Sequence, residues 1–438
     1  MDAIESQPPP PYKRRWYQYS LRSLMIFVLV CGVLLGWAGS FYRRVHYQRR
    51  AVSHALGLGG FVRYDYQYRK NGWPDPDAPP PGPGWLRAIL GDDAFARIDT
   101  IQFGGTKTLK AADLDFLEGL EDLHVLSIVG GGADDEGLRH LSGLRNLHAL
   151  LLCGDRVSDK GLDHLRGLVG LHDLNLSGDH ITNAGLLHLA ALANLERLGF
   201  FHTQVTTEGI ARLPFAANLR HLSLIGATVN DATLTRLDAL TNLESLQIME
   251  ARVTDAGLAH LRGLDKLNEL YLSRVPITDA GLDHLRSLKG LRILRVGGLP
   301  LTDSGIKKLS GLRHISWLDL SATRIGNATL DTLADLPELD YLNVNETAIT
   351  DAGLPSLSQM QRLKSVSLFW TNTTDAGIGA LRKLNRLKGL EIGPGITRQG
   401  AIQLQGVLPE CGIRHIQAGG TVDYTTPVEG ENGSSHHH

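Results

Sequence analysis

The chain of 438 residues contains little cysteine and carries almost no net charge. Its cysteines, Cys31, Cys153 and Cys411, are far apart and odd in number. They provide neither a disulfide framework nor the paired spacing of a zinc site. Lysine and arginine total 44, aspartate and glutamate total 46, and the formal net charge is -2. Because no basic field would attract a polyanion, the composition argues against a nucleic-acid-binding protein.

Motifs of common catalytic and metal sites are also missing. No GxSxG elbow, P-loop, HExxH motif or Rossmann glycine fingerprint occurs in the context that its chemistry requires. Five histidines do recur at one position of the expected repeat: His140, His164, His188, His260 and His284. Packed helices lie about 10 Å apart, whereas zinc needs nitrogens about 2 Å from one centre. The sequence therefore predicts a surface row of solvated histidines, with no metal, no cofactor and no enzymatic activity.

One long hydrophobic run is present near the N-terminus. The twenty residues from Ser23 to Tyr42 include no charged side chain. A helix that rises about 1.5 Å per residue needs about 20 apolar residues to cross a hydrocarbon core. Trp37 and Phe41 stand where interfacial aromatic residues are found. The run therefore predicts a single transmembrane helix over residues 23–42.

A cleaved signal peptide is the alternative, because Gly36-Trp37-Ala38 fits a small-x-small cleavage site. The length of the run favours the anchor. Basic residues are matched on the two sides of the run, at Lys13, Arg14, Arg15, Arg22, Arg43, Arg44, Arg49 and Arg50. Since long domains translocate largely regardless of charge, we expect a cytoplasmic tail over residues 1–22 and the bulk of the chain outside the cytoplasm.

Residues 43–97 form the expected juxtamembrane and N-terminal cap region. Arg49–Leu58 is predicted to be a short basic helix that two glycines end. Val62–Tyr68 alternates as a half-buried strand does, and the proline-rich run Pro74–Pro83 predicts a stiff loop. Trp85–Leu90 is expected to be a small helix that covers the first repeat, because a solenoid needs a cap.

The rest of the chain repeats an apolar position at one constant interval. The positions are Leu114, Leu138, Leu162, Leu186, Ile210, Leu234, Leu258, Leu282, Ile306, Leu330, Leu354, Ile378 and Ile402. A period of this length, about 24 residues, indicates a repeat architecture. We expect a solenoid over residues 98–417, in strict register throughout, and a disordered tail over residues 418–438.

Each repeat combines a strand pattern with a helix pattern, as residues 267–288 illustrate. Leu270 and Leu272 alternate with polar residues and are expected to point into the core. The second half begins with an Ile-Thr-Asp-Ala-Gly-Leu motif, followed by leucines every three residues. Thr278 is placed to N-cap this helix, and Asp279 brings negative charge to the positive end of the helix dipole.

The LxxLxL and ITDAGLxHLxxL segments resemble the leucine-rich repeats of membrane-anchored bacterial proteins, and they are similar to the repeats of F-box substrate receptors. The resemblance covers residues 98–416. It implies an α/β fold, a curved solenoid with parallel strands on the concave side and short helices outside. It also implies that the chain binds other macromolecules and does not catalyse a reaction.

The chain departs from this family in two respects. The asparagine usual after the strand is replaced by threonine, so a buried threonine ladder is expected, at Thr203, Thr323, Thr347 and Thr371. No F-box-like helical segment precedes the repeats, which argues against a ubiquitin-ligase receptor.

The concave positions are the candidate binding site, because function depends on exposed residues rather than on the fold. Apolar and aromatic side chains occupy many of them: Phe201, Ile225, Met249, Tyr271, Trp317, Tyr341 and Phe369, with Trp370 just past a strand end. Exposed aromatic residues are enriched at interfaces. The alternative is that neighbouring repeats shield these residues from solvent.

Three functions follow from this interpretation. The first is a tethered module that binds a protein or a glycan outside the cytoplasm. The second is a structural component of the cell envelope, in which thirteen strands about 4.8 Å apart would span roughly 60 Å. The third is an enzyme, which would need catalytic groups from loops that the sequence does not reveal.

Overall fold

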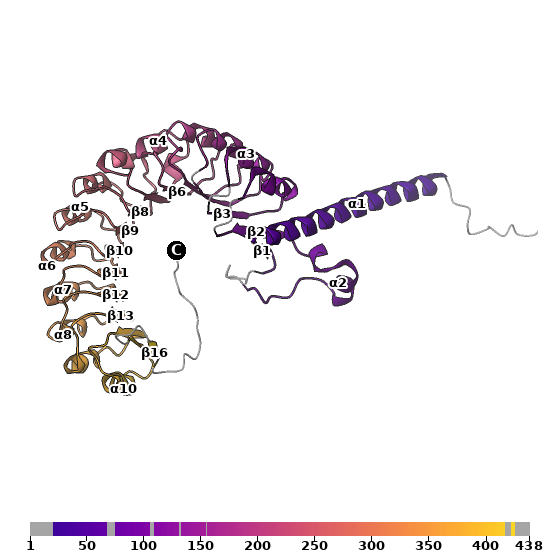
Figure 1. Ribbon diagram of the computed structural model, residues 1–438. Helices are drawn as coiled ribbons and strands as arrows, with labels where there is room; N and C mark the ends of the chain where they lie inside the picture. The colour runs from indigo at the N-terminus through magenta and orange to yellow at the C-terminus, as the bar shows by residue number, and fades with distance from the viewer. Residues whose placement is uncertain are drawn as a thin grey trace, which may run out of the picture. The chain divides into compact units, whose positions relative to one another are not determined.

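A computed structural model describes residues 21–67, 75–105, 109–130, 133–154, 156–416 and 422–424. The chain divides into two compact units (Figure 1): Met1–His54 with Tyr66–Arg97, and Ala55–Asp65 with Ile98–His438. Residues 1–20 of the expected cytoplasmic tail lie outside the described residues, as do residues 418–421 and 425–438 of the expected C-terminal tail.

Helix α1 runs without interruption over Leu21–Gly57. It is long and apolar enough to cross a membrane, with a mean hydropathy of 2.3 over its most apolar stretch, and that stretch is exposed in the structure. The expected separate helix at Arg49–Leu58 is wrong, because it is the last part of α1. Neither proline nor glycine occurs from Ser40 to Leu56, so no residue there breaks the helix.

The first unit packs two short helices against the later part of α1. These are α2 (Gly84–Leu90) and η1 (Asp92–Ala94). Gln48 Nε2 donates to the Ala96 carbonyl at 2.9 Å, and Arg49 Nη2 donates to the Leu90 carbonyl at 2.6 Å. A helix therefore forms close to the expected Trp85–Leu90, but it belongs to the first unit and does not add to the sheet.

The second unit is one continuous sheet, in which the strands lie in sequence order from β1 to β16. Strand β1 (Phe61–Tyr64) is shorter than the expected Val62–Tyr68, and it covers the edge of β2 (Ile98–Phe103) as an antiparallel partner. At the other end β16 (Val422–Tyr424) lies antiparallel to β15 (Gly412–Ile416).

The strands between these edges run parallel. They are β3 (Val125–Val129), β4 (Ala149–Cys153), β5 (Asp173–Ser177), β6 (Arg197–Phe201), β7 (His221–Ile225), β8 (Ser245–Met249), β9 (Glu269–Ser273), β10 (Ile293–Arg295), β11 (Trp317–Asp319), β12 (Tyr341–Asn343), β13 (Ser365–Leu368) and β14 (Gly389–Ile392). Within this unit the strands line the inner side of an arc and the helices line its outer side (Figure 1).

The outer side consists of short α- and 3₁₀-helices. The α-helices are α3 (Asp135–Leu138), α4 (Thr207–Ala211), α5 (Leu282–Leu285), α6 (Asp303–Ile306), α7 (Asn327–Leu333), α8 (Leu354–Leu357), α9 (Ile378–Leu381) and α10 (Arg398–Val407). The 3₁₀-helices are η2 (Ala111–Gly119), η3 (Arg139–Leu141), η4 (Gly161–Leu165), η5 (Gly185–Leu189), η6 (Ala216–Asn218), η7 (Asp231–Leu234), η8 (Leu237–Ala239), η9 (Gly257–Leu261), η10 (Lys307–Leu309) and η11 (Asp375–Gly377). This is the expected leucine-rich-repeat solenoid.

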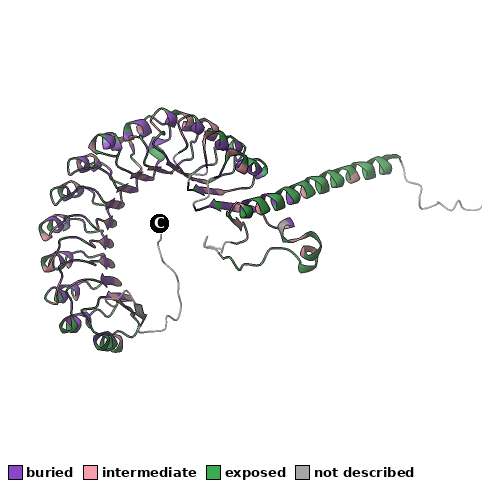
Figure 2. Cartoon of the chain, viewed as in Figure 1, coloured by how far each residue is buried: buried purple, intermediate pink, exposed green. Residues whose placement is uncertain are grey.

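The core fills the space between strands and helices, as the buried residues in Figure 2 show. The apolar residues at the repeat position are buried from Leu114 to Ile378. Each such side chain stabilises the fold by about 1.5–3 kcal/mol relative to an exposed one. Ile402 is an exception, because it is 50% exposed while Ala401 is buried.

The expected strict register is therefore wrong at the ends of the solenoid. Strands pair at the constant interval of the repeat from β3 to β14, as Leu270 does with Leu294. At the start Thr100 pairs with Val125, so this interval is longer by one residue. At the end Gly389 pairs with Gly412, so the interval is shorter by one residue. The residue lost in the last repeat moves Ile402 out of the core.

Consecutive repeats are joined by the threonine and the aspartate of the recurring motif. Thr278 donates its backbone N–H to Asp255 Oδ1 at 2.8 Å and its hydroxyl to Asp255 Oδ2 at 2.6 Å. A Cβ added at Gly281 would overlap Asp255 Oδ1, so a larger residue there would have to displace this carboxylate. Thr278 also accepts from the Ala280 N–H at 3.3 Å. The expected N-cap is wrong, because α5 begins at Leu282 with Gly281 before it and has no side-chain cap. The role of Thr278 is to hold the preceding repeat.

The expected threonine ladder is wrong, because these hydroxyls bond within their own repeats. Thr323 and Thr347 each donate to the carbonyl three residues earlier at 2.6 Å, and Thr371 does so at 2.8 Å. The residue before each of these threonines has a left-handed backbone conformation, as at Ala322, where φ is 53°. The threonine hydroxyl thereby closes a tight turn at the strand end.

Candidate functional site

The concave face consists of the side chains that alternate with the core residues along each strand. Seven of the residues expected to form the binding site are half-buried: Phe201, Ile225, Met249, Tyr271, Trp317, Tyr341 and Phe369. Trp370 is 54% exposed. Neighbouring repeats thus shield these side chains in part, and the structure divides them into three separate groups.

A planar stack forms the first group, on strands β9 to β12. The Trp317 and Tyr341 rings are parallel within 1°, with their centroids 4.2 Å apart. The Arg295 guanidinium lies 4.1 Å from the Trp317 ring centre and 5.0 Å from that of Tyr271. The order along the sheet is therefore Tyr271, Arg295, Trp317 and Tyr341. We refer to these four residues as the concave stack.

The second group is apolar and lies at the ends of strands β6 to β8. Phe201 pairs in register with Ile225, and Ile225 pairs with Met249. These residues occupy the last position of their strands, whereas Trp317 and Tyr341 occupy the first position of theirs. The apolar group is therefore at the other end of the strands from the two stacked rings.

Phe369 and Trp370 form the third group, at the end of β13. Their rings meet edge to face, with centroids 5.5 Å apart. Asn345 Oδ1 accepts the Phe369 N–H at 2.7 Å and holds the turn. The backbone of Trp370 is in the left-handed region, with a φ of 57°. This conformation costs a bulky residue of order 1–3 kcal/mol. Glycine occupies the equivalent position in other repeats, at Gly226 and Gly298.

A groove of about 430 Å³ crosses the concave face from β5 to β11. Its lining includes three members of the concave stack, together with Arg197 and Glu269. Neither the apolar group nor Phe369 lines it. The charged residues of this groove were not predicted from the sequence, because the expectation of a binding face rested on exposed apolar and aromatic side chains. The charged residues share the same columns as the aromatic residues, so the repeat pattern contains the signal that locates them.

Burial and neighbouring charges shift the titration of three groups in this region. Burial, followed by the negative charge of Glu269, raises the pKa of Tyr271 to about 12. Burial and then Asp319 raise the pKa of Tyr341. Burial, followed by the positive charge of Arg197, lowers the pKa of His221. All three groups are therefore held in their uncharged forms at neutral pH.

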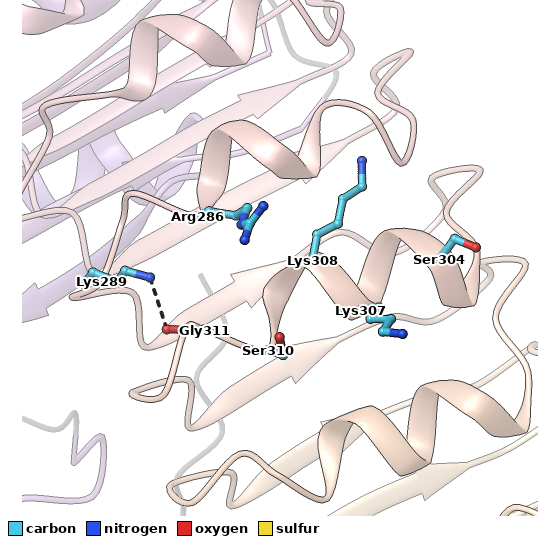
Figure 3. A pocket seen from close by; sticks show the side chains of 7 residues that line it. All are labelled: Arg286, Lys289, Ser304, Lys307, Lys308, Ser310 and Gly311. Atoms are coloured by element: carbon cyan, nitrogen blue, oxygen red, sulfur yellow. Dashed lines mark hydrogen bonds between the residues drawn. The ribbon is translucent and has the colours of Figure 1, made fainter.

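A second hollow, of about 320 Å³, lies on the helical side between two successive repeats (Figure 3). Its lining includes the basic residues Arg286, Lys289, Lys307 and Lys308. Lys308 donates to Asp283 Oδ2 at 2.6 Å, and Lys289 donates to the Gly311 carbonyl at 3.4 Å. Because Lys308 and Lys289 already donate to groups of the chain itself, this hollow is a weaker candidate site than the groove.

The histidine row is not uniformly solvated, contrary to our expectation. His140 is 4% exposed, and its Nδ1 lies 2.6 Å from Glu118 Oε1. His188 Nδ1 lies 3.0 Å from Asp163 Oδ1. Among the described residues, no three histidine, cysteine, aspartate or glutamate side chains are grouped so that they could hold a metal ion.

The chain is similar to known proteins in structure, whereas the sequence comparisons find no match. No protein-family model matches the chain, and no curated protein does so either. An internalin from Listeria monocytogenes shares 20% identity over 70% of this chain and 92% of its own, with a TM-score of 0.47. Internalin C2 from the same species shares 22% identity over 46% of this chain and 82% of its own, with a TM-score of 0.38.

A leucine-rich-repeat protein of Leptospira interrogans is also similar to the chain. It shares 16% identity, covers 71% of this chain and 82% of its own, and has a TM-score of 0.44. At identities and scores of this order, the likenesses assign neither a partner nor an activity to the chain.

Proposed function

We propose that the chain is a membrane-tethered protein-binding module whose concave groove receives the partner. The observation that carries this proposal is the concave stack, in which aromatic side chains and an arginine are held on four consecutive strands. Tryptophan, tyrosine and arginine are the residue types that contribute most at protein interfaces. Strands fix these side chains before binding, so little conformational entropy is lost when a partner arrives.

A protein partner is favoured over a glycan by the way the rings are covered. Sugars stack on exposed aromatic faces, but one face of Trp317 lies against Arg295 at 4.1 Å and the other against Tyr341 at 4.2 Å. The Trp317 ring therefore offers its edge to the groove. Ring edges and polar tips suit the mixed surface of a protein.

Tethering is proposed to come from α1, with the second unit outside the cytoplasm. The apolar part of α1 has the length and composition of a membrane span. Topology reporters fused to Met1 and to the C-terminus test the sidedness. An extracytoplasmic C-terminus is expected, and a cytoplasmic one would contradict this part of the proposal.

Partner capture tests the binding function directly. The full-length chain and a triple variant, Trp317→Ala with Tyr341→Ala and Phe369→Ala, are crosslinked in intact membranes and analysed by mass spectrometry. We expect one stoichiometric protein partner for the wild-type chain, and a loss of at least about tenfold in the variant, as for interface hot spots.

The matched control is Trp85→Ala, which removes a tryptophan that is 66% exposed in α2 of the other unit. It should leave capture unchanged. Circular dichroism and thermal unfolding establish that the triple variant remains folded. Unchanged capture by a folded triple variant would contradict the proposal, and an abundant chain without a partner would favour a structural role in the envelope.

A further inference from the structure

Arg295 is the member of the concave stack whose hydrogen-bonding capacity is unused. No hydrogen bond or ion pair joins its side chain to any of the described residues, and its Nε is buried without an acceptor. A guanidinium has five N–H donors and no means of losing its charge. Donors that are removed from water and left unpaired cost free energy until an acceptor is supplied.

Three arginines in or next to the strands differ from Arg295, because each has an acidic partner in an adjacent repeat. Arg220 Nη1 lies 2.6 Å from Glu244 Oε1, Arg274 Nη1 lies 2.6 Å from Glu250 Oε1, and Arg414 Nη1 lies 2.5 Å from Glu391 Oε1. Arg197 lines the same groove and also forms no ion pair with any described residue, but it is exposed. Arg295 differs from all of these arginines, because it lies in the groove with a buried Nε that has no acceptor.

The two acidic residues beside the concave stack are hydrogen-bonded to other groups. Glu269 Oε2 accepts the Tyr271 hydroxyl at 3.2 Å. Asp319 Oδ1 accepts the N–H of Ser321 at 3.0 Å and its hydroxyl at 2.7 Å. Neither lies within ion-pair distance of Arg295 in the described structure. A ligand could thus bind the guanidinium without breaking an ion pair within the chain.

We propose that Arg295 binds the carboxylate of an aspartate or glutamate side chain in an acidic segment of the protein partner. The inference rests on the proposed function and deepens it by naming the group that the groove recognises. The planar guanidinium matches a carboxylate with two parallel hydrogen bonds. The rings of Tyr271 and Trp317 hold it in one orientation, so binding immobilises little that was free.

A display library of random dodecapeptides tests this proposal while the partner is still unidentified. The library is selected on the full-length chain in detergent micelles, as wild type, as Arg295→Gln and as Arg274→Gln. The last variant is the matched control, because it makes the same change in an arginine that is already paired with Glu250. Wild type and Arg274→Gln should enrich aspartate or glutamate at one fixed peptide position, and Arg295→Gln should lose that enrichment.

A synthetic peptide from the selection then isolates the pair. Replacement of its acidic residue by the corresponding amide should weaken binding to the wild-type chain by about tenfold, the effect of a hydrogen bond to a charged group. It should change little on Arg295→Gln, because the pair is already broken. Arg295→Lys keeps the charge without the planar fork, and it should recover only part of the affinity. Thermal unfolding of each variant establishes that it is folded.

The outcomes separate the two proposals. Equal acidic enrichment on wild type and on folded Arg295→Gln would overturn the role of Arg295 and leave a protein-binding groove in place. Failure of the wild-type chain to select any peptide would count against both proposals. Capture of polygalacturonate in place of peptides, with loss in Arg295→Gln, would assign the guanidinium to an acidic glycan and overturn the proposal of a peptide.

Discussion

Single hydrogen-bonding side chains join the repeats of this solenoid. Asp279 Oδ1 accepts the Thr302 N–H at 2.9 Å, and its Oδ2 accepts the Thr302 hydroxyl at 2.5 Å. Two repeats have asparagine in place of this aspartate, and there the amide repeats the contact. Asn327 Oδ1 accepts the Thr350 N–H, and its Nδ2 donates to the Thr350 hydroxyl, both at 2.9 Å. The contact therefore depends on hydrogen-bonding geometry more than on charge.

This equivalence predicts different effects for two substitutions at one position. Asp279→Ala should lower the free energy of unfolding by about 1–3 kcal/mol, because two donors of Thr302 lose their acceptor. Asp279→Asn should cost much less, since the amide can bond as Asn327 does. Urea unfolding of both variants measures the difference. Equal losses would mean that the carboxylate charge, rather than the hydrogen bonds, holds the repeats together.

Tyr271 gives the concave stack a predicted dependence on alkaline pH. Its pKa is raised from 10.0 to about 12, first by burial and then by Glu269. Because the pKa of Tyr271 is higher in the folded chain than in the unfolded chain, the protonated phenol stabilises the fold. This contribution is fully present below pH 10 and is lost as the pH rises towards 12. Wild type should therefore lose more stability than Tyr271→Phe between these values.

Phenolate absorbance of wild type minus that of Tyr271→Phe follows the same group directly. Glu269→Gln should move the pKa of Tyr271 part of the way back towards 10, because burial still raises it when the charge is gone. An unchanged titration in Glu269→Gln would show that burial alone sets the pKa.

At the scale of elements, the antiparallel strand β1 protects the first edge of the sheet. Val62 pairs with Ile101 across this edge. An uncovered edge strand presents unpaired backbone groups and promotes association. Val62→Pro removes a backbone N–H and fits a strand poorly, so it should expose β2 and cause the chain to self-associate.

Light scattering of the chain in detergent after size-exclusion chromatography measures this association. Val62→Thr is the matched control, because threonine keeps both the N–H and a β-branched side chain. A Val62→Pro chain of unchanged mass would show that β1 is not needed to protect the edge.

The repeating elements were predictable because each one meets the same neighbours. A position buried in one repeat is buried in the next, so the spacing of leucines from Leu114 to Ile378 was enough to predict strands and helices. This periodic argument fails where the neighbours change. At the ends of the sheet the repeat gains or loses one residue, and Ile402 is exposed although the period places it in the core.

The candidate site was predictable only in part. The columns of the concave face located Trp317 and Tyr341, but periodicity does not describe how rings orient. The parallel packing of these rings and the insertion of Arg295 depend on side-chain packing across three strands. The absence of an ion pair at Arg295 could not be inferred either, because Asp319 follows Arg295 in the same column and Glu269 occurs in the adjacent column. Their hydrogen bonds to other groups became visible only in the structure.

For the whole molecule, a solenoid in which each repeat contacts only its neighbours should tolerate the loss of one repeat. Deletion of residues 300–323 removes β11 and places Arg324 after Leu299, in the position of residue 300. Asp279 would then face Gly326 and Thr329, the partners that Asp303 now holds. We expect a folded chain of lower stability in which Tyr341 takes the place of Trp317 beside Arg295.

A second deletion, of residues 136–159, removes β4 and leaves the groove strands β5 to β11 in place. It shortens the solenoid by the same amount, one strand spacing of about 4.8 Å, so the pair of deletions separates length from local chemistry. Crosslinking in membranes should show that the first deletion abolishes partner capture and that the second preserves it. Equal loss in both would mean that the partner depends on the full length of the array, as a structural envelope role requires, since only the first deletion alters the concave stack.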